Sequence, residues 1–118
     1  MQVSISPDLL RGHTDTIILN ILRHGDSYGY EIYKTIIEKT GEQFELKEAT
    51  LYSSIRRLEQ EHHIESYWGD ETQGGRRKYY RITESGRALY TKNRADWEFS
   101  VKILKNLLGR EANEYKNL

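Results

Sequence analysis

Basic side chains gather in one short stretch of the chain, Gly74–Thr83, which reads GGRRKYYRIT. Four of its residues are Lys or Arg and none is acidic, although the whole chain holds 18 basic and 18 acidic residues. Lysine and arginine are the side chains that neutralise phosphate, and arginine presents a planar fork of donors. A local basic cluster on a neutral chain therefore indicates contact with a polyanion such as nucleic acid.

This stretch is expected to form the tip and the second strand of a β-hairpin. The segments Ile64–Trp68 and Arg77–Ile82 are rich in aromatic and β-branched residues, and the loop between them contains two consecutive glycines. Alternation with a period of two places Tyr80 and Ile82 on the core side of the second strand. The residues predicted to contact phosphate are Arg76, Arg77 and Lys78. The alternative is an edge strand whose charges only prevent aggregation.

A helix predicted from about Glu48 to His62 carries the second candidate surface. Leu51, Ile55 and Leu58 recur at helical spacing and form its buried stripe. The opposite side is small, polar and basic, so the helix can enter a major groove, where an arginine can bind guanine. The residues of this helix predicted to contact DNA are Ala49, Thr50, Tyr52, Ser53, Arg56 and Arg57. The alternative is an ordinary solvated helix surface.

Two further helices must support these surfaces. The first is predicted over residues 7–24, with Ser6 as its N-cap and Gly25 as a left-handed residue after its end. The second is predicted over residues 29–39, and Gly41 is expected to stop it.

The last helix is predicted to begin at Glu84, with Thr83 as its N-cap, and to reach about Leu108. It is roughly 37 Å long at 1.5 Å per residue, more than a small domain can cover by itself. Three helices, two strands and a final helix are the order of a winged helix-turn-helix. The predicted fold class is mainly α with a small β-hairpin. Residues 1–83 are expected to form the DNA-binding domain and residues 84–118 the dimerisation helix and tail, in one compact unit.

Composition and motifs exclude several classes of function. The chain has no cysteine, which removes disulfides and thiolate catalysis. Its four histidines show no metal-ligand spacing, and no nucleophile with a base and no phosphate-binding glycine loop is recognisable. We therefore expect a protein that is not an enzyme, with no catalytic residue, no metal and no cofactor. Without a signal segment or an apolar run of spanning length, the chain is expected to be cytoplasmic and to have no membrane contact.

The apolar content of 36% is low for a self-sufficient globule of 118 residues. Apolar side chains also follow the last helix at helical spacing, among them Leu89, Trp97, Val101, Leu104 and Leu108. A second copy of the chain would cover this stripe, so a homodimer is expected.

Four motifs run along the chain in a characteristic order. They are Tyr28-Gly29-Tyr30-Glu31-Ile32, Ala49-Thr50-Leu51-Tyr52 with Arg57-Leu58-Glu59, Gly74-Gly75-Arg76-Arg77-Lys78-Tyr79-Tyr80, and Thr83 with Gly86. Together they resemble the PadR family of bacterial transcriptional regulators, over about residues 9–108. The short length is similar to that of the subfamily with a single C-terminal helix. The resemblance implies a homodimer that binds a palindromic operator in double-stranded DNA and usually represses transcription.

Some members of that subfamily sense drugs or other aromatic compounds, and Trp97 falls where drug-binding members carry a tryptophan. The resemblance places seven other residues near it: Leu9, His13, Thr16, Leu19, Leu89, Asn93 and Val101. Two Trp97 side chains close to a two-fold axis would stack a planar aromatic effector between them. The alternative is a tryptophan that only packs the dimer. Asp96 and Glu98 flank Trp97 and would favour a cationic ligand if they faced inward.

These observations predict a ligand-responsive, DNA-binding repressor, with multidrug sensing as the finer hypothesis. One rival is a winged-helix protein-interaction module that never binds DNA, in which the basic residues of the helix and the hairpin would not share a face. A second rival is a small-molecule-binding scaffold whose role in DNA binding is secondary.

Overall fold

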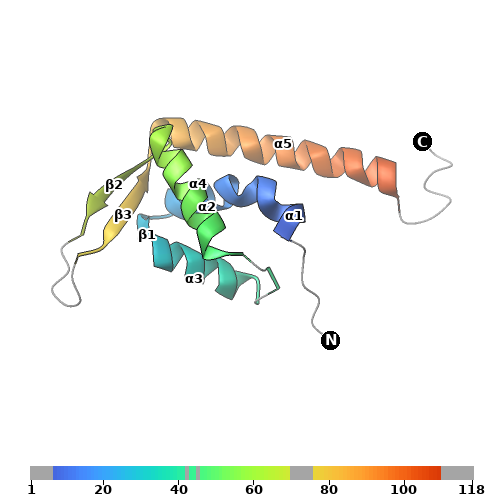
Figure 1. Ribbon diagram of the computed structural model, residues 1–118. Helices are drawn as coiled ribbons and strands as arrows, with labels where there is room; N and C mark the ends of the chain where they lie inside the picture. Colours follow the sequence, from blue (N-terminus) through green and yellow to red (C-terminus); the bar gives the residue numbers. More distant parts are fainter. Residues whose placement is uncertain (1–6, 42, 45, 70–75, 110–118) are drawn as a thin grey trace.

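The computed structural model describes residues 7–41, 43–44, 46–69 and 76–109 (Figure 1). Its elements are α1 (Pro7–Leu10), the 3₁₀ turn η1 (Arg11–His13), α2 (Thr14–Arg23), β1 (Ser27–Tyr28), α3 (Gly29–Lys39), α4 (Glu48–Gln60), β2 (Ile64–Trp68), β3 (Lys78–Ile82) and α5 (Glu84–Leu108). The predicted fold class is confirmed, because a helical core carries a small antiparallel sheet and a long C-terminal helix.

The prediction of one continuous first helix is wrong. Residues 7–23 form α1, η1 and α2 in succession, with the break at Arg11–His13. At this break the hydroxyl of Thr14 donates to the carbonyl of Arg11 at 3.2 Å, and the backbone N–H of Thr14 donates to the same carbonyl. Pro7 begins α1 as predicted, whereas the expected N-cap Ser6 lies outside the described residues.

The predicted left-handed cap at Gly25 is also wrong. In the described ranges, φ angles in the left-handed region occur only at Gly41 (58°) and His62 (63°). The amides of His24 and Gly25 instead donate to carbonyls three residues earlier, both at 3.2 Å, so α2 ends in a tighter turn. Gly41 does end α3 as predicted.

The third helix was predicted to reach His62, but α4 ends at Gln60. His62 takes a left-handed conformation, and the chain turns there into β2. The short strand β1 was not predicted. Two residues are too few for a periodic signal, and β1 exists because Ser27 and Tyr28 pair with Tyr80 and Tyr79 of β3.

The three strands form an antiparallel sheet in the order β1-β3-β2. In the β2–β3 hairpin Ile64 lies opposite Ile82, and Trp68 lies opposite Lys78. Tyr80 and Ile82 are buried, as the alternation predicts. Tyr79 faces the other way and stacks on Tyr67 with ring centroids 5.7 Å apart. The sheet therefore has one face on the core and one aromatic face toward solvent.

The core lies between α2, α3, α4 and the inner face of the sheet. Its buried apolar residues are Ile18, Leu19, Leu22, Ile32, Ile36, Phe44, Leu46, Leu51, Ile55, Leu58, Ile64, Tyr80 and Ile82. Leu51, Ile55 and Leu58 are at most 1% exposed, which confirms the predicted buried stripe of α4. This packing holds the outer face of α4 toward solvent, beside the wing formed by β2 and β3 (Figure 1).

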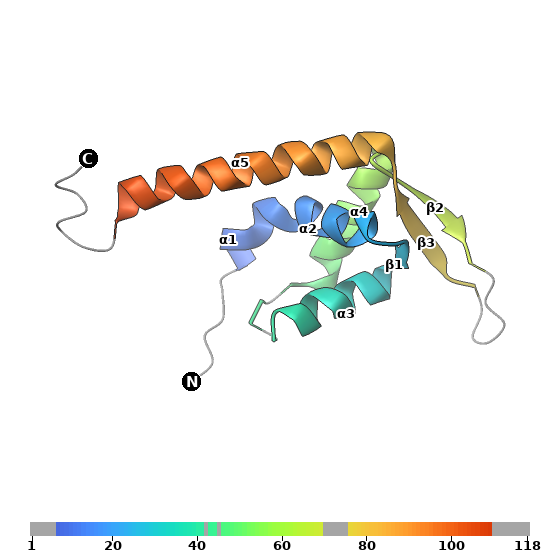
Figure 2. The same ribbon diagram turned by 180° about the vertical axis from the view of Figure 1, so that it is seen from behind.

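The helix α5 begins as predicted, because the Thr83 hydroxyl accepts a hydrogen bond from the Gly86 amide at 3.1 Å. Its first half packs against α2, and its second half projects beyond the other helices (Figures 1 and 2). Large apolar side chains on this second half are exposed, namely Trp97, Phe99, Ile103, Leu104, Leu107 and Leu108. Across the described ranges, no helix combines the length and the apolar character that a membrane span requires.

Candidate nucleic-acid interface

The outer face of α4 presents the residues that the sequence selected. Ala49, Ser53, Arg56 and Arg57 are exposed. Arg56 forms no ion pair with any residue in the described part of the chain, so no described acid engages its guanidinium. Small side chains at the first turns and an exposed arginine at the third turn are what a helix needs to enter a groove.

Thr50 and Tyr52 lie at the two edges of this face and are half-buried. The Tyr52 ring packs over Gly29 at the start of α3, where any larger residue would collide with it. Burial, with a smaller contribution from Glu48, raises the pKa of Tyr52 above its usual value. The Tyr52 hydroxyl therefore stays protonated at neutral pH and can donate a hydrogen bond to phosphate.

Arg57 is half-exposed and is held by an acid. Its Nη2 donates to Oδ1 of Asp15 on α2 at 2.5 Å, and this hydrogen bond raises the pKa of Arg57 above its usual value. One donor of the guanidinium is thus engaged within the protein, and Arg57 also links α4 to α2.

The wing places its three basic residues in different surroundings. Arg76 lies over the Trp68 ring at 5.7 Å, and Arg77 lies over the Tyr28 ring at 4.7 Å. Lys78 faces α4, where its Nζ is 3.6 Å from Oε1 of Glu59. All three side chains are exposed. The tip between β2 and β3, including Gly74 and Gly75, lies outside the described residues.

A depression of about 450 Å³ separates the wing from the start of α3. The residues around it are Tyr28, Gly29, Tyr30, Tyr52, Arg77, Lys78 and Tyr80. Tyr30, which is 58% exposed, was not among the predicted contacts. Its motif served only to support the family resemblance, and nothing in its local sequence indicates that the fold brings it beside the wing.

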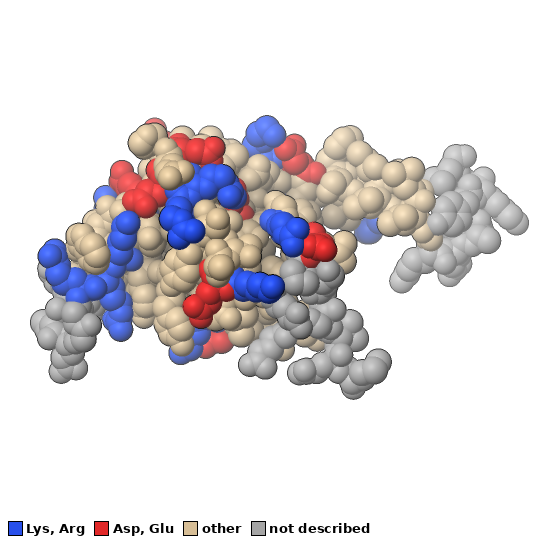
Figure 3. Space-filling view, in the orientation of Figure 1, with Lys and Arg blue, Asp and Glu red and all other residues tan. Residues whose placement is uncertain are grey.

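Lys and Arg side chains gather over the wing and over α4 on one face of the molecule (Figure 3). Acidic side chains lie among them, in agreement with the ion pairs Arg57–Asp15 and Lys78–Glu59. The two surfaces predicted from the sequence therefore lie on the same side of the fold.

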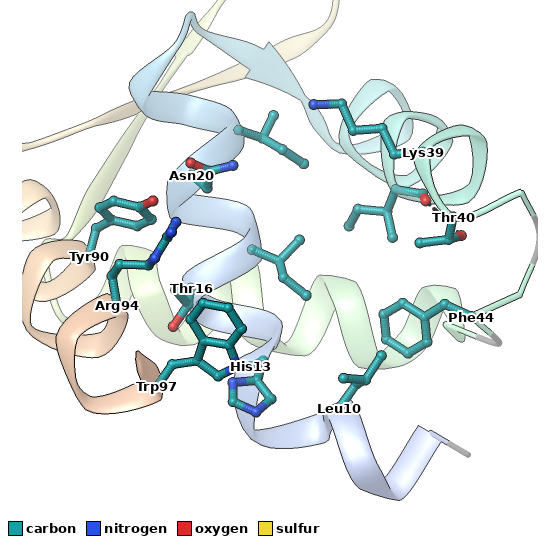
Figure 4. Close-up of a pocket in the computed structure, with 13 residues that line it drawn as sticks. Leu10, His13, Thr16, Asn20, Lys39, Thr40, Phe44, Tyr90, Arg94 and Trp97 are labelled. Atoms are coloured by element: carbon teal, nitrogen blue, oxygen red, sulfur yellow. Dashed lines mark hydrogen bonds between the residues drawn. The ribbon is translucent and has the colours of Figure 1, made fainter. Parts of the chain in front are cut away.

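A separate groove of about 360 Å³ lies between α2, the end of α3 and α5. Trp97, His13 and Thr16 stand on one side of it, and Lys39 and Phe44 stand on the other (Figure 4). Its remaining lining residues are Leu10, Ile17, Asn20, Ile21, Ile36, Thr40, Tyr90 and Arg94. The groove is apolar in its middle and has cationic residues at its edges.

Of the eight residues predicted for a ligand site, Trp97, His13 and Thr16 line this groove. The other five do not line it: Leu19 is fully buried in the core, Leu9 is 72% exposed, and Leu89, Asn93 and Val101 are half-buried on α5.

The acids beside Trp97 are not part of the groove. Asp96 pairs with Lys92 at 2.7 Å, and Glu98 pairs with Arg94 at 3.0 Å. Within the described ranges no group of three or more His, Asp or Glu side chains could hold a metal ion.

The chain matches a family of transcriptional regulators and is similar in sequence and fold to known proteins. Residues 18–92 match the transcriptional regulator PadR-like family. Uncharacterized protein X of Lysinibacillus sphaericus is 46% identical over 100 residues, which cover 85% of this chain and 92% of that protein. A transcriptional regulator from Clostridium thermocellum, Cth-833, is 49% identical with a TM-score of 0.81, over 88% of this chain and 98% of the other.

A third similar structure is that of Bacillus subtilis PadR in complex with operator DNA. It is 26% identical, with a TM-score of 0.59, and the match covers 66% of this chain and 44% of that one. From the family match and the level of identity, the chain belongs to the PadR-like family of transcriptional regulators.

Proposed function

We propose that this protein is a homodimeric repressor that binds a palindromic operator in double-stranded DNA. Its α4 helix enters the major groove, and its wing lies against the flanking backbone. The observation that carries the proposal is the shared face of α4 and the basic wing (Figure 3). A protein-interaction module has no need for this convergence, and the operator complex of Bacillus subtilis PadR supplies a similar fold bound to DNA.

The proposed contacts divide by chemistry. Ala49, Thr50, Ser53 and Arg56 face the bases, because they are small or can donate to base edges. Tyr52 and the wing residues Arg76, Arg77 and Lys78 face phosphates. To these we add Tyr30, which lines the depression beside the wing and carries a hydroxyl that can donate to phosphate. Arg57 is proposed as a contact through the donors that Asp15 leaves open.

Binding to labelled DNA from the promoter of its own gene tests this function. Titrations at several salt concentrations, with random duplex as competitor, should give much tighter binding to the promoter DNA. Equal affinity for promoter and random DNA at moderate salt would refute the repressor proposal.

Arg76→Ala tests the wing in the same assay. Each lost phosphate contact should reduce the slope of log K against log salt by about 0.9. The matched control is Lys92→Ala, which removes the same charge from α5, an element outside α4 and the wing. If Arg76→Ala keeps the wild-type slope, Arg76 does not contact phosphate.

The proposed dimer interface is the second half of α5. Exposed apolar side chains recur there, with Leu104 50%, Leu107 65% and Leu108 68% exposed, and a monomer seldom leaves such a continuous stripe in water. Leu9, 72% exposed on α1, adds to this apolar surface. A second copy of the chain, with the same stripe on its own α5, would cover it around a two-fold axis.

The groove beside Trp97 is proposed as the effector site, together with the other predicted ligand residues near the interface. Its apolar middle and its indole suit a planar aromatic compound. The charged residues that line the groove are Lys39 and Arg94, whereas the neighbouring acids Asp96 and Glu98 do not line it. This arrangement favours a neutral or anionic ligand over a cationic one. Such a ligand relieves repression only if it binds the DNA-incompetent arrangement of the dimer more tightly.

Tryptophan fluorescence tests the effector site. The anionic probe 2-naphthoate should quench the wild-type protein and Trp68→Phe but have little effect on Trp97→Phe. Quenching by the cationic dye proflavine alone would contradict the proposed charge preference. If neither probe quenches the fluorescence, the effector site is refuted and Trp97 is only a packing residue.

A further inference from the structure

The carboxylate of Glu59 lies between α4 and the wing and contacts both strands of the hairpin. Its Oε2 accepts a hydrogen bond from the hydroxyl of Ser66 on β2 at 2.5 Å. Its Oε1 lies 3.6 Å from Nζ of Lys78 on β3. Each strand of the wing is thus tied to a different oxygen of the same side chain in the last turn of α4.

The position of Glu59 is unfavourable for DNA binding, so we expect a structural role that offsets this disadvantage. The side chain is only 32% exposed, and it places a negative charge beside a residue proposed to contact phosphate. A bare carboxylate there would weaken DNA binding by repulsion. Its two partners belong to one of the two DNA-contacting elements, and Glu59 itself belongs to the other.

We infer that Glu59 is a positioning residue that sets the orientation of the wing relative to α4. The inference rests on the proposed DNA-binding function. Specific binding requires α4 in the major groove and the wing on the flanking backbone at the same time, whereas non-specific binding needs only charge. Loss of Glu59 therefore lowers the preference for operator over random DNA, and it does not lower affinity for DNA in general.

The chain offers a matched control in the ion pair between Glu65 and Arg81. It joins the same two strands, with Arg81 Nε 2.9 Å from Glu65 Oε1. Both side chains are exposed, and neither contacts α4 in an ion pair or hydrogen bond found in the described residues. Glu65→Ala thus removes an equal charge from the hairpin without removing a tie to α4.

The experiment compares the ratio of affinities for promoter and random DNA in wild type, Glu59→Ala and Glu65→Ala. Glu59→Ala should reduce the ratio on the order of tenfold, the scale of one lost specific contact. Glu65→Ala should leave the ratio within about twofold of wild type. Ser66→Ala, which keeps the carboxylate and its charge, should reduce the ratio in the same direction as Glu59→Ala and remains informative if Glu59→Ala does not fold.

An unchanged ratio in folded Glu59→Ala, or in Ser66→Ala if Glu59→Ala is unfolded, would overturn the positioning role while the proposed function stands. Equal losses in Glu59→Ala and Glu65→Ala would also overturn it, because charge alone would then account for both. If wild type itself does not discriminate promoter from random DNA, the proposed function fails, and the positioning role fails with it. Circular dichroism and thermal unfolding of each variant separate these outcomes from loss of the fold.

Discussion

At the scale of single residues, acids on neighbouring elements decide how the cations of the interface are presented. Arg57 and Lys78 are paired with such acids. Arg56 and Arg76 pair with no acid in the ranges that the structure describes. Exposed ion pairs contribute little to stability, so the importance of the two pairs lies in orienting side chains rather than in holding the fold.

Gly86 is a residue on which the fold depends. It is buried in the first turn of α5, and a Cβ there would overlap the backbone carbonyl of His63. Because a backbone carbonyl cannot rotate away, Gly86→Ala should reduce the free energy of unfolding by about 1–3 kcal/mol despite the higher helix propensity of alanine. Gly25→Ala, which places a methyl group in open space, is the control. Urea denaturation measures both, and equal stabilities would show that the helix shifts to accept the methyl group.

Tyr80 should make stability depend on pH in the alkaline range. Burial is the main cause that raises its pKa, and Glu59 adds to the effect. Above about pH 10, the usual pKa of tyrosine, the unfolded chain loses a proton that the folded chain retains. Stability therefore falls as pH rises from there through the folded-state pKa. Tyr80→Phe should lose less unfolding free energy than wild type between about pH 9 and about pH 11. Parallel losses in urea titrations would contradict this assignment.

At the scale of elements, α5 has two halves with different roles. The first half packs on α2 and completes the core, whereas the second half exposes an apolar stripe. The second half is also richer in large apolar residues, and the structure adds that it projects beyond the neighbouring helices (Figure 2).

Leu104→Glu tests the second half of α5. Leu104 is 50% exposed, so a monomer would accept the charge, but a dimer would have to bury it. We expect sedimentation velocity to show a monomer at concentrations where wild type is a dimer. Lys102→Ser alters an exposed residue on the other side of the helix and should stay dimeric. A Leu104→Glu protein that remains fully dimeric would place the interface elsewhere.

At the scale of the whole molecule, each copy of the chain presents one proposed DNA-binding surface, made of α4 and the wing. The distance between the two surfaces of a dimer therefore decides which operators it can bind. In a two-fold dimer the two α4 helices would contact half-sites about one turn of the DNA duplex apart, which is about 10 base pairs. Occupancy of both half-sites raises affinity only when the geometry allows simultaneous contact.

Operator spacing can therefore be tested directly once the promoter site is mapped. Inserting about 5 base pairs between the half-sites turns one of them to the opposite face of the duplex and should abolish dimeric binding. Inserting about 10 base pairs restores the face but not the distance and should recover part of the affinity only if the dimer can stretch. Equal tolerance of both insertions would indicate binding by independent monomers.

Local interactions made much of this fold predictable. The Thr83 cap and the stripe Leu51, Ile55 and Leu58 involve residues at most a few positions apart, and both are as predicted. The strand β1 was missed, because it depends on pairing with a distant part of the chain. Tyr28 of β1, for example, pairs with Tyr79.

The sequence by itself determined which residues carry positive charge, which face of α4 is polar and where α5 is capped at its start, since these follow from residue type and spacing. Only the tertiary structure decided which surfaces share a face and which cations are held by acids. Asp15 and Arg57 are 42 residues apart, and no local pattern brings them together. Glu59 likewise reaches Ser66 and Lys78 only because packing of the core sets the hairpin against the end of α4.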